Sequence, residues 1–120
     1  MKTAGYWINM QDAYFQEKND VGNWLQIGYS APGTKDGTYS YHSNVFGYSG
    51  SETEGVGDWV AVPSVDLNEC TAGTADAWKA EATLNGTAGS ASNFQISVTG
   101  DAKCTALTAS WSSLSRASGN

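Results

Sequence analysis

The chain has 120 residues, with twelve acidic and six basic side chains and a formal net charge of −6. This length suits a single domain around one modest hydrophobic core. Nucleic-acid binding requires clustered Lys and Arg, so the acidic balance disfavours it. We find neither a run of eighteen apolar residues nor a secretory signal pattern in these residues.

The first predicted element is an amphipathic helix from Ala4 to Lys18. Aromatic and apolar residues recur there every three or four positions, and the helix is expected to stop at residues 19–22. The stripe expected to pack on the rest of the fold consists of Trp7, Met10 and Tyr14. The opposite side of this helix is expected to be left for neighbouring molecules.

Residues 1–3 resemble neither a signal peptide nor a loop leading into a fold, so we expect the natural start of this helix to be missing. We therefore expect one domain over residues 1–120, in which residues 1–22 are a truncated helix and residues 23–120 a β-rich head. The chain has an even number of cysteines, Cys70 and Cys104, which suits one disulfide in an oxidising, extracellular compartment. The alternative of a zinc site lacks ligands, because His42 is the only histidine.

Short strand patterns and turn signals follow the helix. Residues 24–29 alternate and predict a strand, and Ala31 to Gly33 predict a turn. Residues 38–41 could form a strand, and residues 44–48 predict a clearer one. Residues 49–58 read as a polar loop.

The second half continues in the same manner. Residues 59–62 predict a strand, and residues 94–98 alternate most regularly of all. Residues 76–84 fit a helix or a strand; the alternation of apolar side chains favours the strand, with Asn85-Gly86 as a hairpin turn beyond it.

The end of the chain has no single predicted element. Residues 105–114 fit a strand or a helical turn, and the final five residues are expected to fray. The predicted fold class is α+β: one N-terminal amphipathic helix packed on a small antiparallel sheet of about four strands, with one disulfide. The five tryptophans are expected to anchor the core, one per element: Trp7, Trp24, Trp59, Trp78 and Trp111.

Signals for catalysis are weak, and we expect no enzyme and no cofactor. Residues 28–32 and 47–51 approach the nucleophile-elbow pattern but lack its final glycine. His42 has no acidic residue beside it in sequence, so a catalytic triad would need a distant carboxylate. Residues 55–57 lack the third glycine of a dinucleotide-binding loop.

Calcium is the one ion that the sequence leaves open. Glu52, Glu54 and Asp58 lie on a glycine-rich stretch and offer hard oxygen ligands, and Asp66, Asn68 and Glu69 form a second such group. Neither group matches the spaced acidic loop of an EF-hand, so solvated surface charge is the preferred interpretation and no metal site is expected.

Three features stand out in residues 4–33, which comprise the helix and its continuation: the aromatic register of Gln11 to Phe15, the small residues that begin the helix, and the Trp-x-x-Ile-Gly-Tyr stretch that starts at Trp24. In these features the segment resembles type IV pilins and pseudopilins. The later pair Cys70 and Cys104 is similar to the pilin disulfide, which pins the C-terminal region to the sheet. The resemblance covers the whole chain in layout and about residues 4–33 in local sequence.

This resemblance implies a structural subunit of an extracellular, cell-surface filament, either a major or a minor pilin. Other pilin subunits would be its partners, and a missing apolar helix half would anchor it in the membrane before assembly. The isolated head would then be monomeric and catalytically inert.

A second interpretation is a small extracellular carbohydrate-binding or adhesion module. Four rings in the loop-and-strand region of residues 38–48 are the candidates for an exposed aromatic platform: Tyr39, Tyr41, Phe46 and Tyr48.

Overall fold

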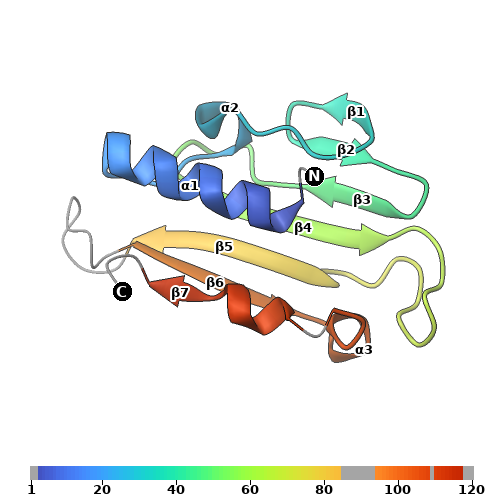
Figure 1. Ribbon diagram of the computed structural model, residues 1–120. Coiled ribbons are helices and arrows are strands. Elements are labelled where there is room, and N and C mark those ends of the chain that lie inside the picture. The colour runs from blue at the N-terminus through green and yellow to red at the C-terminus, as the bar shows by residue number, and fades with distance from the viewer. Residues whose placement is uncertain (1–2, 85–93, 109, 118–120) are drawn as a thin grey trace.

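The computed structural model describes residues 3–84, 94–108 and 110–117. It is an α+β domain in which one N-terminal helix, α1 (Ala4–Lys18), lies across one face of an antiparallel sheet (Figure 1). This agrees in kind with the predicted fold class. Within the described ranges, no helix is both long enough and apolar enough to cross a membrane.

Over the described residues the sheet has seven strands, and their spatial order follows the sequence order. Every neighbouring pair is antiparallel. The strands are β1 (Thr34–Gly37), β2 (Ser40–His42), β3 (Phe46–Ser49), β4 (Gly57–Pro63), β5 (Trp78–Leu84), β6 (Phe94–Gly100) and β7 (Arg116–Ala117). The expected count of about four was too low, and β1 and β7, with four and two residues, are too short to show a two-residue period.

Helix α1 buries one face against the sheet. The five residues on that face follow helical spacing: Ala4, Trp7, Ile8, Gln11 and Phe15. The phenyl ring of Phe15 stacks on that of Phe94 in β6, with 4.9 Å between ring centroids. The helix ends at Asn19, which adopts a left-handed conformation (φ 57°) and donates its N–H to the Phe15 carbonyl.

The segment predicted as a strand over residues 24–29 is instead a short helix, so that prediction was wrong. Helix α2 (Trp24–Ile27) starts with a reciprocal capping box: Asn23 accepts from the Gln26 N–H, and Gln26 accepts from the Asn23 N–H. Gly28 ends it in a left-handed conformation. These caps favour one helical turn over the alternation that suggested a strand.

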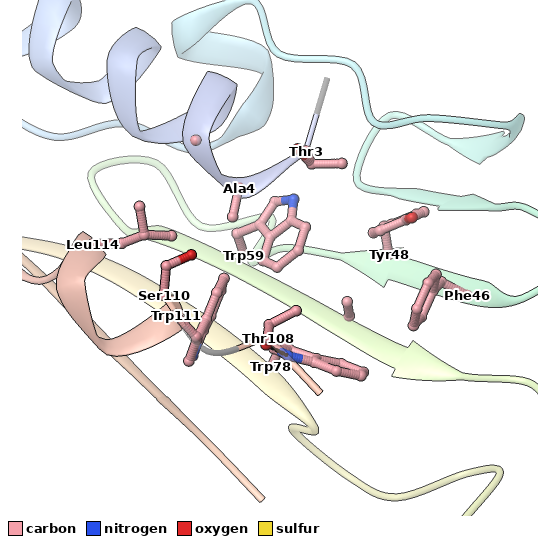
Figure 2. A pocket seen from close by; sticks show the side chains of 12 residues that line it. Thr3, Ala4, Phe46, Tyr48, Trp59, Trp78, Thr108, Ser110, Trp111 and Leu114 are labelled. Atoms are coloured by element: carbon pink, nitrogen blue, oxygen red, sulfur yellow. Dashed lines mark hydrogen bonds between the residues drawn. The ribbon is translucent and has the colours of Figure 1, made fainter. Parts of the chain in front are cut away.

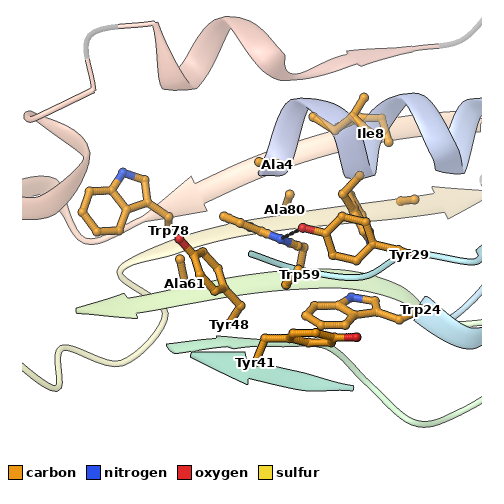
Figure 3. Packing of buried hydrophobic residues seen from close by; sticks show 14 of the residues in the cluster. Ala4, Ile8, Trp24, Tyr29, Tyr41, Tyr48, Trp59, Ala61, Trp78 and Ala80 are labelled. Atoms are coloured by element: carbon orange, nitrogen blue, oxygen red, sulfur yellow. Dashed lines mark hydrogen bonds between the residues drawn. The ribbon is translucent and has the colours of Figure 1, made fainter. Parts of the chain in front are cut away.

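Strands β4 and β5 form the centre of the sheet, and β5 resolves the ambiguity over residues 76–84 in favour of a strand. In their register, Trp59 lies opposite Ala80, and Ala61 lies opposite Trp78. Each indole is therefore paired with a small residue, which lets large rings fill the space under α1 (Figure 3).

Cys70 and Cys104 form a disulfide with an S–S distance of 2.04 Å, and both side chains are fully buried. The bond joins the connection between β4 and β5 to α3 (Ala102–Thr105), which follows β6 directly. It thereby fixes two distant parts of the chain at the same end of the sheet (Figure 1).

The end of the chain contains a single 3-10 turn, η2 (Trp111–Leu114), followed by β7. Strand β7 pairs with β6, so the expectation of a frayed end was wrong for residues 116–117. Residues 118–120 and the predicted Asn85-Gly86 turn lie outside the described residues. Of the five tryptophans, four are buried, and Trp111 in η2 is half-buried.

Candidate functional site

A groove of about 310 Å³ opens beside the first turn of α1. Its walls come from three adjacent strands and from η2, which the fold brings together although they are far apart in sequence (Figure 2). Five aromatic side chains dominate the lining: Phe46, Tyr48, Trp59, Trp78 and Trp111. We call this site the aromatic groove.

The five rings form a continuous chain of contacts around the groove. Trp111 lies 6.1 Å from Trp59 between ring centroids, and Trp59 lies 5.8 Å from Tyr48. Tyr48 is 5.9 Å from Phe46, which meets Trp78 edge-on at 5.5 Å. These separations are those of favourable tilted and edge-to-face aromatic pairs, so the rings hold one another in place.

Every indole N–H of the groove is already used within the fold. Trp59 Nε1 donates to the Tyr29 hydroxyl at 2.9 Å, and the dashed line in Figure 3 marks this bond. Trp78 Nε1 donates to Thr108 Oγ1 at 2.8 Å, and Trp111 Nε1 donates to the Thr99 carbonyl at 2.9 Å. The groove therefore offers ring faces and edges to a ligand, and no indole donors.

The electrostatic character of the groove is neutral. Among the described residues that line it, Tyr48 is the one with a titratable side chain, and burial raises the pKa of its phenol more than the hydrogen bond with Ser43 lowers it. Tyr29 behind the groove has its pKa raised further, again mainly by burial. Both phenols are uncharged at neutral pH.

The predicted aromatic platform is not an exposed surface of four rings. Tyr41 and Tyr48 are only 9% and 7% exposed, while Tyr39 and Phe46 are half-buried. Tyr41 lies directly opposite Tyr48 in the β2–β3 register, so both side chains point to the inner face of the sheet. That prediction was wrong, although Phe46 and Tyr48 do line the aromatic groove.

The three tryptophans of the groove were assigned to the core by sequence and not to a site. Trp59 and Trp78 are indeed buried, but each also turns part of its ring toward the groove. Their clustering depends on the β4–β5 register and on the return of η2 over the sheet. No local pattern in the chain signals that meeting.

The predicted stripe of α1 is divided between two environments. Trp7 is fully buried under the helix. Met10 and Tyr14 are half-buried and line a shallow hollow with Gln26 and Ile27 of α2. The face toward the sheet is therefore rotated relative to the predicted stripe, and it is centred on Gln11.

The acidic residues considered for calcium do not converge. In the ranges that the structure describes, no three His, Cys, Asp or Glu side chains are placed to hold a metal ion. Glu52 and Glu54 are exposed on the β3–β4 loop, and Asp58 accepts a hydrogen bond from the Ser51 N–H. In the second group, Asp66 accepts from the Ala72 N–H. These two aspartates stabilise turns.

His42 does have a carboxylate beside it, which sequence reasoning missed. His42 Nδ1 lies 2.8 Å from both carboxylate oxygens of Asp36, across the β1–β2 hairpin. A bulge between Lys35 and Gly37 brings Asp36 into this position. Both side chains are about half exposed, so the pair is a solvated surface contact.

The two near matches to a nucleophile elbow do not have the required geometry. That motif places its serine on a turn from a parallel strand into a helix. Ser49 instead ends β3 of an antiparallel sheet, and Ser30 follows α2.

No protein-family model, curated protein or solved structure matches this chain. The fold and the site define this protein as an α+β domain with an aromatic groove beside its N-terminal helix and one internal disulfide.

Proposed function

We propose that this protein is a structural subunit of an extracellular filament of the type IV pilus or pseudopilus kind. The observation that carries the proposal is the one-sided packing of α1. The helix buries its inner face on the sheet, while its outer face remains open along the whole element (Figure 1).

The outer face of α1 suits contact with neighbouring subunits. Tyr6 is 44% exposed there, and Gly5, Asn9 and Ala13 are exposed with it. Small and polar side chains allow another helix to approach closely, and an exposed tyrosine is typical of interfaces. None of the residues on this face carries a charge between positions 5 and 11.

A filament subunit must also withstand the extracellular environment. The buried Cys70–Cys104 disulfide suits an oxidising compartment. Under this proposal the protein is not an enzyme, its partners are further subunits, and an apolar segment upstream of Ala4 anchors it in the membrane before assembly. The isolated head is then monomeric, because that apolar segment supplies most of the assembly energy and heads with a net charge of −6 repel one another.

A charge placed on the outer face of α1 tests the proposal in the source cells. Ala13→Arg in the full-length gene should abolish or strongly reduce filaments seen by electron microscopy, because an arginine is costly in a close helix contact. The matched control is Ala106→Arg at a residue that is also exposed but lies after α3. Both isolated heads should melt at the same temperature as the parent.

Antiserum against the head provides the second part of this experiment. Gold-labelled antibody should decorate filaments of the parent and of the control along their length. Unlabelled filaments, or normal filament numbers with Ala13→Arg, would contradict the proposal, as would a tight head dimer in sedimentation.

A further inference from the structure

We propose that the aromatic groove binds an uncharged sugar ring. This inference does not depend on the filament proposal, because the groove meets the outer face of α1 only at Gly5. It gives the alternative adhesive role a site other than the platform expected from sequence.

The first support is the shape and chemistry of the walls. A pyranose has one face of C–H groups, and such faces pack well on the rings of tryptophan, which combine a large apolar area with few rotatable bonds. Trp59 and Trp111 form adjacent walls at a tilt of 39°, and Trp78 lies between Trp111 and Phe46 (Figure 2). The volume of about 310 Å³ lies at the small end of the range for ligand pockets, which suits a ring more than a helix or a long peptide.

The second support is the charge around the groove, which disfavours ionic ligands. The N-terminal end of α1 lines the groove, and the partial positive charge of a helix N-terminus repels cations. An anion meets the long-range repulsion of a protein with a net charge of −6, and among the residues that the structure describes no Lys or Arg lines the groove to offset it. A neutral molecule rich in oxygen acceptors is the complementary ligand.

The third support is the polar rim. Thr3 precedes α1 but makes no side-chain cap, and the first intrahelical bond runs from the Trp7 N–H to the Thr3 carbonyl. The earlier N–H groups of this turn therefore have no intrahelical acceptor. Ser110 brings a second hydroxyl from the η2 side, whereas Thr108 is already bonded to Trp78. These groups can bind sugar hydroxyls that project from the apolar face.

The experiment is a titration of the folded chain with maltose and with cellobiose, followed by ¹⁵N NMR and by tryptophan fluorescence. We expect the indole N–H signals of Trp59, Trp78 and Trp111 to shift together, with a Kd in the millimolar range. The indole signals of Trp7 and Trp24, which do not line the groove, should stay in place.

Two variants test the site at different positions, so the test does not depend on the correct folding of a single variant. Trp111→Ala removes a half-buried wall and should weaken binding about tenfold. Ser110→Arg adds bulk at an exposed rim position and should weaken binding without changing the melting temperature. The control is Tyr6→Ala, an exposed aromatic outside the groove, which should bind sugar as the parent does.

The proposal is overturned if neither sugar shifts these indole signals at about 50 mM, far above a millimolar Kd. It is also overturned if Ser110→Arg binds as well as the parent, or if tetramethylammonium or benzoate shifts the same signals while both sugars do not. None of these results bears on filament assembly, so the two proposals can fail separately.

Discussion

Gln11 and Gly22 exchange two hydrogen bonds in the interior of the protein. Gln11 Nε2 donates to the Gly22 carbonyl at 2.6 Å, and the Gly22 N–H donates to Gln11 Oε1 at 3.2 Å. The amide of Gln11 thus ties the middle of α1 to the chain that leads into α2. A Cβ at Gly57 would approach the same amide at 2.7 Å, so the sheet is also packed closely against it.

Gln11→Ala should lower the free energy of unfolding by about 2 to 4 kcal/mol. The substitution leaves the buried N–H and carbonyl of Gly22 without partners and opens a small cavity. The control is Gln16→Ala on the exposed side of the same helix, which should change stability by less than about 0.5 kcal/mol. Urea unfolding measures both, and equal effects would contradict this account of the clamp.

Replacing both Cys70 and Cys104 by alanine should lower the free energy of unfolding by about 4 kcal/mol. The bond spans 34 residues, and the chain-entropy model assigns roughly this value to a loop of that length. Intact mass should rise by about two hydrogens when the parent is reduced. Labelling of free thiols in the unreduced parent would contradict the bond.

Two glycines provide a matched pair of alanine substitutions with opposite expected signs. At Gly5 an added Cβ meets nothing within 4 Å, so Gly5→Ala should raise stability by about 0.5 to 1 kcal/mol through its helix propensity. At Gly50 the added Cβ would lie 2.7 Å from Cε2 of the buried Trp24 ring, so Gly50→Ala should lower stability by about 1 to 3 kcal/mol. Thermal melts of the two variants decide the point.

Stability should fall above about pH 10 because Tyr29 is buried. The unfolded chain loses the phenol proton near the ordinary pKa of about 10, while burial raises the pKa of Tyr29 in the fold. The stability that the protonated Tyr29 phenol contributes is therefore fully present below pH 10 and is lost as the pH rises toward the pKa of Tyr29 in the fold. Tyr48 acts in the same direction.

Tyr29→Phe should make the alkaline decline shallower. At neutral pH it should lower stability by about 1 to 2 kcal/mol, because Trp59 Nε1 loses its acceptor. Urea midpoints measured from pH 7 to pH 11 separate these effects. The control is Tyr6→Phe at the exposed phenol, and an equal change in slope for both variants would contradict the role of burial.

Removing divalent metal should leave the melting temperature almost unchanged. The carboxylate of Asp58 accepts the Ser51 N–H, and Glu52 and Glu54 are exposed, so the β3–β4 loop is held by hydrogen bonds of the protein itself. Melts with a chelator and with millimolar calcium provide the measurement. A marked rise of the midpoint with calcium would imply a binding site by linkage.

Strands with a long alternating pattern could be located from sequence. The alternation of residues 94–98 and 59–62 reflects a sheet with one face buried under α1, and these segments lie within β6 and β4. The choice between helix and strand over residues 76–84 followed the same logic. Such patterns arise because successive side chains of a strand point to opposite faces of the sheet, so that they meet the core and the solvent in turn.

The error at residues 24–29 came from overlooking local capping signals. Asn23 and Gln26 stand three positions apart, and Gly28 follows, which together predict a single helical turn. Tyr41 and Tyr48 show a different limit. Whether a tyrosine faces the core depends on strand pairing and on what covers the sheet, and the sequence of β2 or β3 alone contains neither.

The chain's own patterns were thus enough for an α+β domain with an N-terminal helix, a mainly antiparallel set of strands and one cysteine pair. The aromatic groove required the assembled fold, because Trp59, Trp78 and Trp111 meet through strand register and through the return of η2 over the sheet. Secondary structure follows from interactions a few residues apart, whereas a site follows from contacts between residues tens of positions apart, and those contacts form only when the core packs.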